Sequence, residues 1–222
     1  MSDTAEAVLF DYGGVLTGPV RPSIESWLTR EHLDAAVLWE VLGSWVSAST
    51  GESTPVHRLE TGELELGEFD RLLAARLRRR DGSRPSADGL TAAMLAELRP
   101  DTAMFELVGD LREAGIRVGM LSNSWAGTYP RDLIDALLDP IVISAEVGLR
   151  KPDPAIFELA VDRLGMRPDQ VLFVDDSMDN VAGARRAGLR ALLHTDPHGT
   201  RIAMAALLER PSPQNTPQRR TP

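Results

Sequence analysis

Short apolar runs alternate with longer stretches of helical periodicity along most of the chain. Residues 8–10 form one such run, which is typical of a strand buried in a parallel sheet. After residue 99 the same pattern predicts strands at 117–121, 141–144, 171–174 and 190–194, with helices at 102–114, 130–138, 154–164 and 179–187. This alternation predicts an α/β fold in which helices cover both faces of a parallel sheet, giving three α/β/α layers.

Residues 23–98 differ from the rest because their apolar positions have helical spacing without a strand pattern. Thr54 is expected to cap a helix that begins at Pro55. Residues 18–22 contain glycine and two prolines, so we expect a linker there. Three tryptophans recur at helical intervals and are expected to form an apolar core within this region: Trp27, Trp39 and Trp45.

These patterns divide the chain into three parts. We expect a sheet domain from residues 1–18 and 99–208, interrupted by an all-helical domain at residues 19–98. Residues 209–222 are rich in proline and polar side chains and lack apolar periodicity, so we expect a disordered tail.

Composition narrows the classes of partner and chemistry. The 24 basic and 33 acidic residues give a net charge of −9, which argues against a nucleic-acid-binding surface. No apolar run approaches the roughly 18 residues of a membrane span, and no signal-peptide pattern opens the chain. The absence of cysteine excludes disulfides, thiolate nucleophiles and cysteine-bound zinc. We therefore expect a cytoplasmic protein that binds neither nucleic acid nor membranes.

Polar side chains follow three of the predicted strands. Asp11 comes directly after the first strand and precedes two glycines, Ser122 follows the second, and the pair Asp175-Asp176 ends another. The carboxyl ends of parallel strands meet at one edge of a sheet, where ligands bind. Lys151 is the only lysine in the chain, so we expect it to have a specific role rather than to be a casual surface charge.

These positions occur in the order Asp11-Tyr12-Gly13-Gly14, Leu121-Ser122-Asn123-Ser124, Arg150-Lys151-Pro152-Asp153 and Val174-Asp175-Asp176. The ordered set resembles the four motifs of the haloacid dehalogenase-like (HAD) superfamily, in its phosphatase branch. The resemblance implies a Rossmann-like core, and the helical insertion after the first strand resembles the C1 cap of these enzymes. Residues 57–69 are similar to the cap of the subgroup that includes the N-terminal phosphatase domain of soluble epoxide hydrolase.

The resemblance also implies a role for each residue. Asp11 would be the nucleophile that forms an aspartyl phosphate, while Lys151 would neutralise Asp11 and the phosphate. Ser122 and Asn123 would hold and orient a small phosphorylated metabolite. Mg²⁺ would be the cofactor, because it favours oxygen ligands. The implied metal site consists of Asp11, the backbone carbonyl of Gly13 and Asp176, with Asp175 behind them.

Gly13 departs from the pattern of most phosphatases of this superfamily, which carry a second aspartate as general acid and base at that position. The absence of this second aspartate implies a substrate with a better leaving group, a proton donor from elsewhere or slow turnover. Two alternatives therefore remain open: a catalytically weak domain that binds a phosphorylated ligand or a protein partner, and a 2-haloacid dehalogenase. The dehalogenase typically has a tyrosine at the position of Gly13 and lacks the acidic pair that Asp175 and Asp176 form here.

Overall fold

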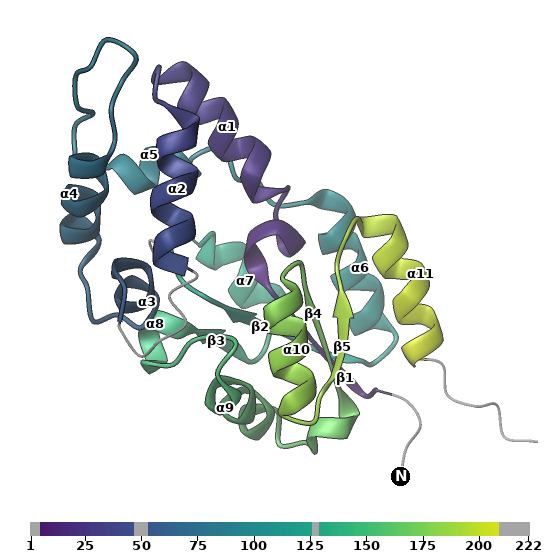
Figure 1. Cartoon of the computed structure of the whole chain (residues 1–222). Coiled ribbons are helices and arrows are strands. Elements are labelled where there is room, and N and C mark those ends of the chain that lie inside the picture. The colour runs from purple at the N-terminus through teal and green to yellow at the C-terminus, as the bar shows by residue number, and fades with distance from the viewer. Residues whose placement is uncertain (1–4, 47–52, 126–128, 209–222) are drawn as a thin grey trace, which may run out of the picture.

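A five-stranded, all-parallel sheet with the strand order β3-β2-β1-β4-β5 forms the centre of the protein (Figure 1). The computed structural model describes residues 5–46, 53–125 and 129–208, so the predicted tail at 209–222 lies outside the described residues. The strands are β1 (Ala7–Phe10), β2 (Arg117–Ser122), β3 (Ile141–Ile143), β4 (Val171–Asp175) and β5 (Arg190–Leu193). β1 pairs with both β2 and β4, so its carboxyl end lies between theirs.

Helices cover both faces of this sheet, which confirms the predicted three-layer α/β/α fold. Val8 and Phe10 point to one face, where they pack in a core with Met104 and Met204. Leu9 points to the other face, whose core includes the helices α9 and α10. The covering helices are α6 (Thr102–Glu113), α7 (Arg131–Leu137) and α11 (Pro197–Leu208) on the first face, and α9 (Pro154–Leu164) and α10 (Met178–Arg186) on the second.

Five further helices lie together away from the sheet, at the upper left of Figure 1. They are α1 (Val20–Arg30), α2 (Ala35–Val46), α3 (Pro55–Glu60), α4 (Leu66–Arg76) and α5 (Leu90–Leu95). We call the described part of residues 19–98 the helical insertion. Its apolar side chains form a core separate from the two cores of the sheet, with Phe69 and Leu73 fully buried. Trp125, which follows β2, packs against this separate core.

Several local expectations are corrected by the structure. The predicted linker is shorter, because α1 already begins at Val20. Pro22 lies in the first turn of this helix, where a backbone N–H would have no partner within the helix, so proline is tolerated there. β3 ends at Ile143, and the next residue begins the short helix α8 (Ser144–Val147). The helix α11 was not predicted. Within the described residues, no helix combines the length and the apolarity that crossing a membrane requires.

Candidate active site

Asp11 directly follows the central strand β1. Its backbone N–H donates to the carbonyl of Val174 at 2.9 Å, which continues the pairing with β4. Its carboxylate accepts a 2.7 Å hydrogen bond from the N–H of Tyr12. The chain then turns through Gly14, which has a φ of +79°. A Cβ at Gly14 would lie 2.3 Å from Oδ2 of Asp176, so the glycine allows the turn to approach the acidic end of β4.

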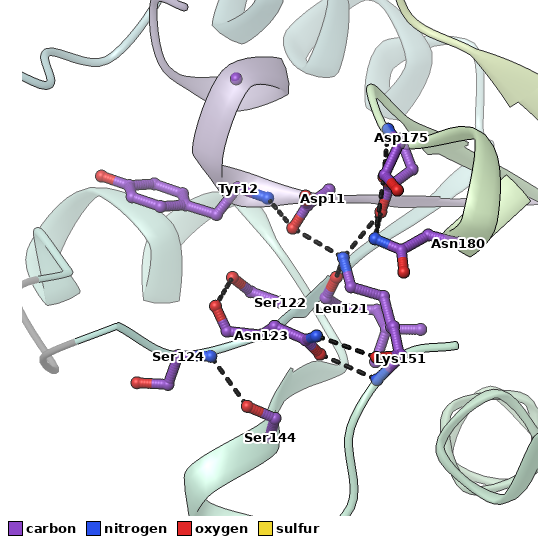
Figure 2. A network of polar contacts seen from close by, with 12 residues as sticks. Asp11, Tyr12, Leu121, Ser122, Asn123, Ser124, Ser144, Lys151, Asp175 and Asn180 are labelled. Carbon is purple, nitrogen blue, oxygen red and sulfur yellow. Dashed lines mark hydrogen bonds and ion pairs between the residues drawn. The ribbon is translucent and has the colours of Figure 1, made fainter. Parts of the chain in front are cut away.

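Lys151 lies in the loop before α9, and its ammonium group is buried between two carboxylates (Figure 2). Its Nζ is 2.8 Å from Oδ1 of Asp11 and 2.7 Å from Oδ2 of Asp175, and it donates to the carbonyl of Leu121 at 3.0 Å. The side chain of Asn123 holds the backbone of Lys151 in place. Its Oδ1 accepts from the N–H of Lys151 at 2.9 Å, and its Nδ2 donates to the carbonyl of the same residue at 3.1 Å.

Asp11, Asp175 and Asp176 each place a carboxylate oxygen within 4.8 Å of the others. Asp175 is fully buried and its oxygens accept from Lys151, from the N–H of Ser177 at 2.8 Å and from the amide of Asn180 at 3.1 Å. Three carboxylates therefore cluster beside a single ammonium group, which contacts two of them. This excess of negative charge and the all-oxygen donor set fit a hard divalent cation such as Mg²⁺.

Burial and charge shift the pKa values of this cluster in opposite directions. Burial raises the pKa of Asp11 to about 7, although the neighbouring Lys151 acts to lower it. Burial alone would lower the pKa of Lys151, but Asp11 and Asp175 outweigh it and raise that pKa above its usual value. Lys151 is therefore positively charged, whereas Asp11 needs a further cation nearby to be fully ionised at neutral pH.

Ser122 is buried at the end of β2, beside the nucleophile candidate. Its hydroxyl accepts a 3.0 Å hydrogen bond from the hydroxyl of Tyr129, whose ring packs edge-on against Tyr12 at 4.9 Å between centroids. Burial raises the pKa of Tyr129 to about 12, so this hydroxyl remains a donor at neutral pH. Every residue for which the sequence predicts a catalytic, substrate or metal role thus lies at one edge of the sheet: Asp11, Gly13, Ser122, Asn123, Lys151, Asp175 and Asp176.

Glu60, at the end of α3, was not singled out from the sequence although it connects the helical insertion to this site. Its buried carboxylate accepts from Nε of Arg150 at 2.6 Å, from the indole N–H of Trp125 at 2.7 Å and from the amide of Asn123 at 3.4 Å. The sequence does contain an indication of this role, because Glu60 lies four residues after Val56 and therefore on the same face of α3, which is buried. A carboxylate on an apolar helix face requires a partner from elsewhere in the fold.

The chain is similar to several known proteins. The fraction of each relative's own length that this chain covers differs widely. A mouse protein named acyl-CoA dehydrogenase family member 10 is 27% identical over 97% of this chain, which spans only 20% of that protein. The sesquiterpene phosphatase astK of Aspergillus oryzae is 27% identical over 94% of this chain and 99% of its own. A HAD family enzyme from Bacteroides thetaiotaomicron, in complex with magnesium and inorganic phosphate, is 21% identical and superposes with a TM-score of 0.63, covering 86% of this chain and 94% of that one.

A sequence profile of the haloacid dehalogenase-like hydrolases matches residues 5–188, which include β1, the helical insertion and the strands through β4. The match therefore contains all the residues of the carboxylate cluster and Lys151. The chain belongs to the family of haloacid dehalogenase-like hydrolases.

Proposed function

We propose that this protein is a Mg²⁺-dependent phosphatase that hydrolyses a small phosphate monoester through an aspartyl phosphate on Asp11. The observation that carries the proposal is the position of the ammonium group of Lys151, which touches both Asp11 and Asp175 in a cluster that still has an excess of negative charge. The Aspergillus relative, named as a phosphatase and aligned over nearly its whole length, supports the reaction class.

Asp11 is proposed to act as the nucleophile. An oxygen of its carboxylate attacks phosphorus, the bond from phosphorus to the alcohol oxygen breaks, and the leaving alcohol takes a proton from water. A water molecule then attacks phosphorus of the aspartyl phosphate, which releases inorganic phosphate and regenerates the carboxylate. The positive charge of Lys151 offsets negative charge on Asp11 and on the phosphoryl oxygens during both steps.

Asp11 and Asp176 would hold the Mg²⁺ ion, together with the backbone carbonyl of Gly13. When bound, Mg²⁺ reduces the repulsion between the carboxylate nucleophile and the anionic phosphate. Asp175 is proposed to act mainly through Lys151, because its oxygens already accept from that residue, Ser177 and Asn180. The Bacteroides structure, which contains magnesium and inorganic phosphate, supports magnesium as the metal.

Ser122 is proposed to contact the phosphate, and Asn123 to help orient it mainly through Lys151. The hydroxyl of Ser122 accepts from Tyr129 and keeps its own proton for a ligand oxygen, with only a long 3.5 Å contact to the carbonyl of Asn123. The amide of Asn123 is engaged with the backbone of Lys151, so its contribution to binding is mainly to position that lysine.

The helical insertion is proposed to be a cap domain, with residues 19–98 as the cap and residues 1–18 and 99–208 as the core. Its separate apolar core supports this division. A cap at the carboxyl ends of the strands would exclude water from the phosphoryl group and select the alcohol.

Hydrolysis of p-nitrophenyl phosphate by the purified protein tests the proposal. We expect release of p-nitrophenol with Mg²⁺, loss of activity with EDTA, and loss of activity in Asp11→Asn. Asp88→Asn, which removes an exposed carboxylate in the helical insertion, is the matched control and should retain activity. Metal-independent release of halide from 2-chloropropionate would instead show a dehalogenase.

Gly13 favours one second candidate, a catalytically weak domain that binds a phosphorylated ligand, because a glycine side chain cannot donate a proton to the leaving group. Stabilisation of the protein by beryllium fluoride with Mg²⁺, without turnover of any phosphate ester, would support that candidate over the phosphatase.

A further inference from the structure

A cavity of about 610 Å³ lies between the helical insertion and the carboxyl ends of the strands. Its volume is within the range of about 300–1,000 Å³ that is usual for small-molecule sites. Asp11, Ser122 and Lys151 form its polar end, and α1 and α2 contribute the opposite wall. A phosphate at Asp11 would therefore have its alcohol portion inside this cavity.

The wall facing the polar end is almost entirely apolar. It is built from aliphatic and aromatic side chains of α1, α2, the end of α5 and the segment after it: Val20, Ile24, Trp39, Leu42, Leu95 and Leu98. Trp39 is half-buried: it packs against the apolar core of the insertion, as expected from the sequence, and it also faces this space, whereas Trp27 and Trp45 are buried. A hydroxyl-rich alcohol would lose hydrogen bonds to water here without replacing them, whereas a hydrocarbon group gains free energy by leaving water.

Each positively charged group that lines the cavity among the described residues is already paired with a carboxylate. Lys151 contacts Asp11, and Arg21 contacts Glu25 at 3.0 Å while its guanidinium lies 4.6 Å from the ring centre of Trp39. The remaining charged lining residue, Glu60, is anionic. A second phosphate or a carboxylate on the substrate would therefore meet no unpaired cation in the described lining.

We infer that the substrate is the phosphate monoester of an uncharged, largely hydrocarbon alcohol, whose apolar part lies against α1 and α2. The inference rests on the proposed phosphatase function and specifies its substrate class. It excludes as good substrates the phosphorylated sugars, which are rich in hydroxyls, and the phosphorylated amino acids and other esters that carry a second ionised group.

A series of 4-alkylphenyl phosphates tests the inference, because their phenol leaving groups have nearly equal acidity and differ in apolar length. We expect kcat/KM for phosphate release in Mg²⁺ to rise by about fourfold for each added methylene until the cavity is filled, mainly through a lower KM. O-Phosphotyrosine has the same phenol leaving group with an added carboxylate and ammonium. Its kcat/KM should be about tenfold or more below that of 4-propylphenyl phosphate.

Two variants connect this selectivity to the cavity wall. Leu98→Gln should remove most of the dependence of kcat/KM on alkyl length, because its side chain lines the apolar wall of the cavity. Val46→Asp, at a half-exposed lining position, serves the same purpose if Leu98→Gln fails to fold. Leu72→Gln is the matched control, because Leu72 is an exposed leucine of α4 outside the cavity lining.

The outcomes of these assays distinguish the substrate class from the phosphatase function on which it rests. An active protein whose kcat/KM is flat with alkyl length, or that hydrolyses O-phosphotyrosine as well as the alkyl esters, would overturn the substrate class and leave the phosphatase function intact. No phosphate release from any ester in Mg²⁺ would overturn the proposed function and the substrate class with it.

Discussion

Removal of the carboxylate of Glu60 is expected to destabilise the protein and to slow catalysis. In Glu60→Ala, the guanidinium of Arg150, the indole N–H of Trp125 and the amide of Asn123 all lose an acceptor. Removing one partner of a buried ion pair typically costs 3–5 kcal/mol, and the side chain of Arg150 is still 23% exposed, so we expect about 3 kcal/mol.

Thermal and chemical denaturation measure this loss. For a chain of this size, about 3 kcal/mol corresponds to a fall in melting temperature of about 6–12 °C. Glu63→Ala, an exposed glutamate of the same segment, is the matched control and should change the free energy of unfolding by less than about 0.5 kcal/mol. In a double-mutant cycle with Arg150→Gln, the two substitutions together should cost less than the sum of the single ones, because neither charge is then left unpaired.

The effect on catalysis follows from the contact between Glu60 and Asn123, whose amide positions Lys151. We therefore expect a lower kcat for p-nitrophenyl phosphate in Glu60→Ala at temperatures where the variant is fully folded, with partial recovery in Glu60→Gln. A change of less than about 1 kcal/mol in unfolding free energy with unaltered kcat would refute the reasoning that this carboxylate links the helical insertion to the site.

Three further predictions concern the turn after β1 and the carboxylate cluster. Gly13→Asp should fold, because a Cβ there meets Cγ2 of Val20 at an ordinary 3.6 Å, and should raise kcat for alkyl phosphates by up to about 100-fold with a smaller gain for p-nitrophenyl phosphate. An unchanged ratio of the two rates would contradict this. Gly14→Ala should lower kcat/KM at fixed Mg²⁺ by about 100-fold, because its positive φ is unfavourable and the added Cβ displaces Asp176; full activity would show that this approach is not needed. Because burial raises the pKa of Asp11 from 3.8 to about 7, its folded state binds a proton more tightly than its unfolded state. The proton on Asp11 stabilises the folded state fully below about pH 4, and this stabilisation is lost as the pH rises through about 7. Over this window the free energy of unfolding of the metal-free protein in EDTA, measured by urea denaturation, should therefore fall by up to about 4 kcal/mol relative to that of Asp11→Asn. Equal pH profiles for the two proteins would contradict the assigned shift.

The sequence was sufficient to predict the layers of the fold and the edge of the sheet at which the candidate residues meet. Short apolar runs locate buried strands, and parallel pairing brings their carboxyl ends together, so the proximity of Asp11, Ser122 and Asp175 follows from the pattern. Local signals were equally informative. Thr54 accepts from the N–H of His57, and Asp153 caps α9, as expected of residues at helix starts.

Features that depend on contacts between distant segments could not be predicted. The partner of Glu60 is Arg150, which lies 90 positions later in the chain, and no local pattern indicates that pairing. The apolar wall of the cavity likewise depends on which faces of α1 and α2 turn toward the sheet rather than toward the insertion's own core. Trp39 illustrates this, since its helical spacing is compatible with either direction.

Mass spectrometry of the protein after an acid quench during turnover of p-nitrophenyl phosphate in Mg²⁺ tests the central claim most directly. We expect an increase by the mass of one phosphoryl group on the peptide that contains Asp11, absent in EDTA and in Asp11→Asn. A phosphoryl group on a different residue, or full hydrolytic activity in Asp11→Asn, would contradict the account.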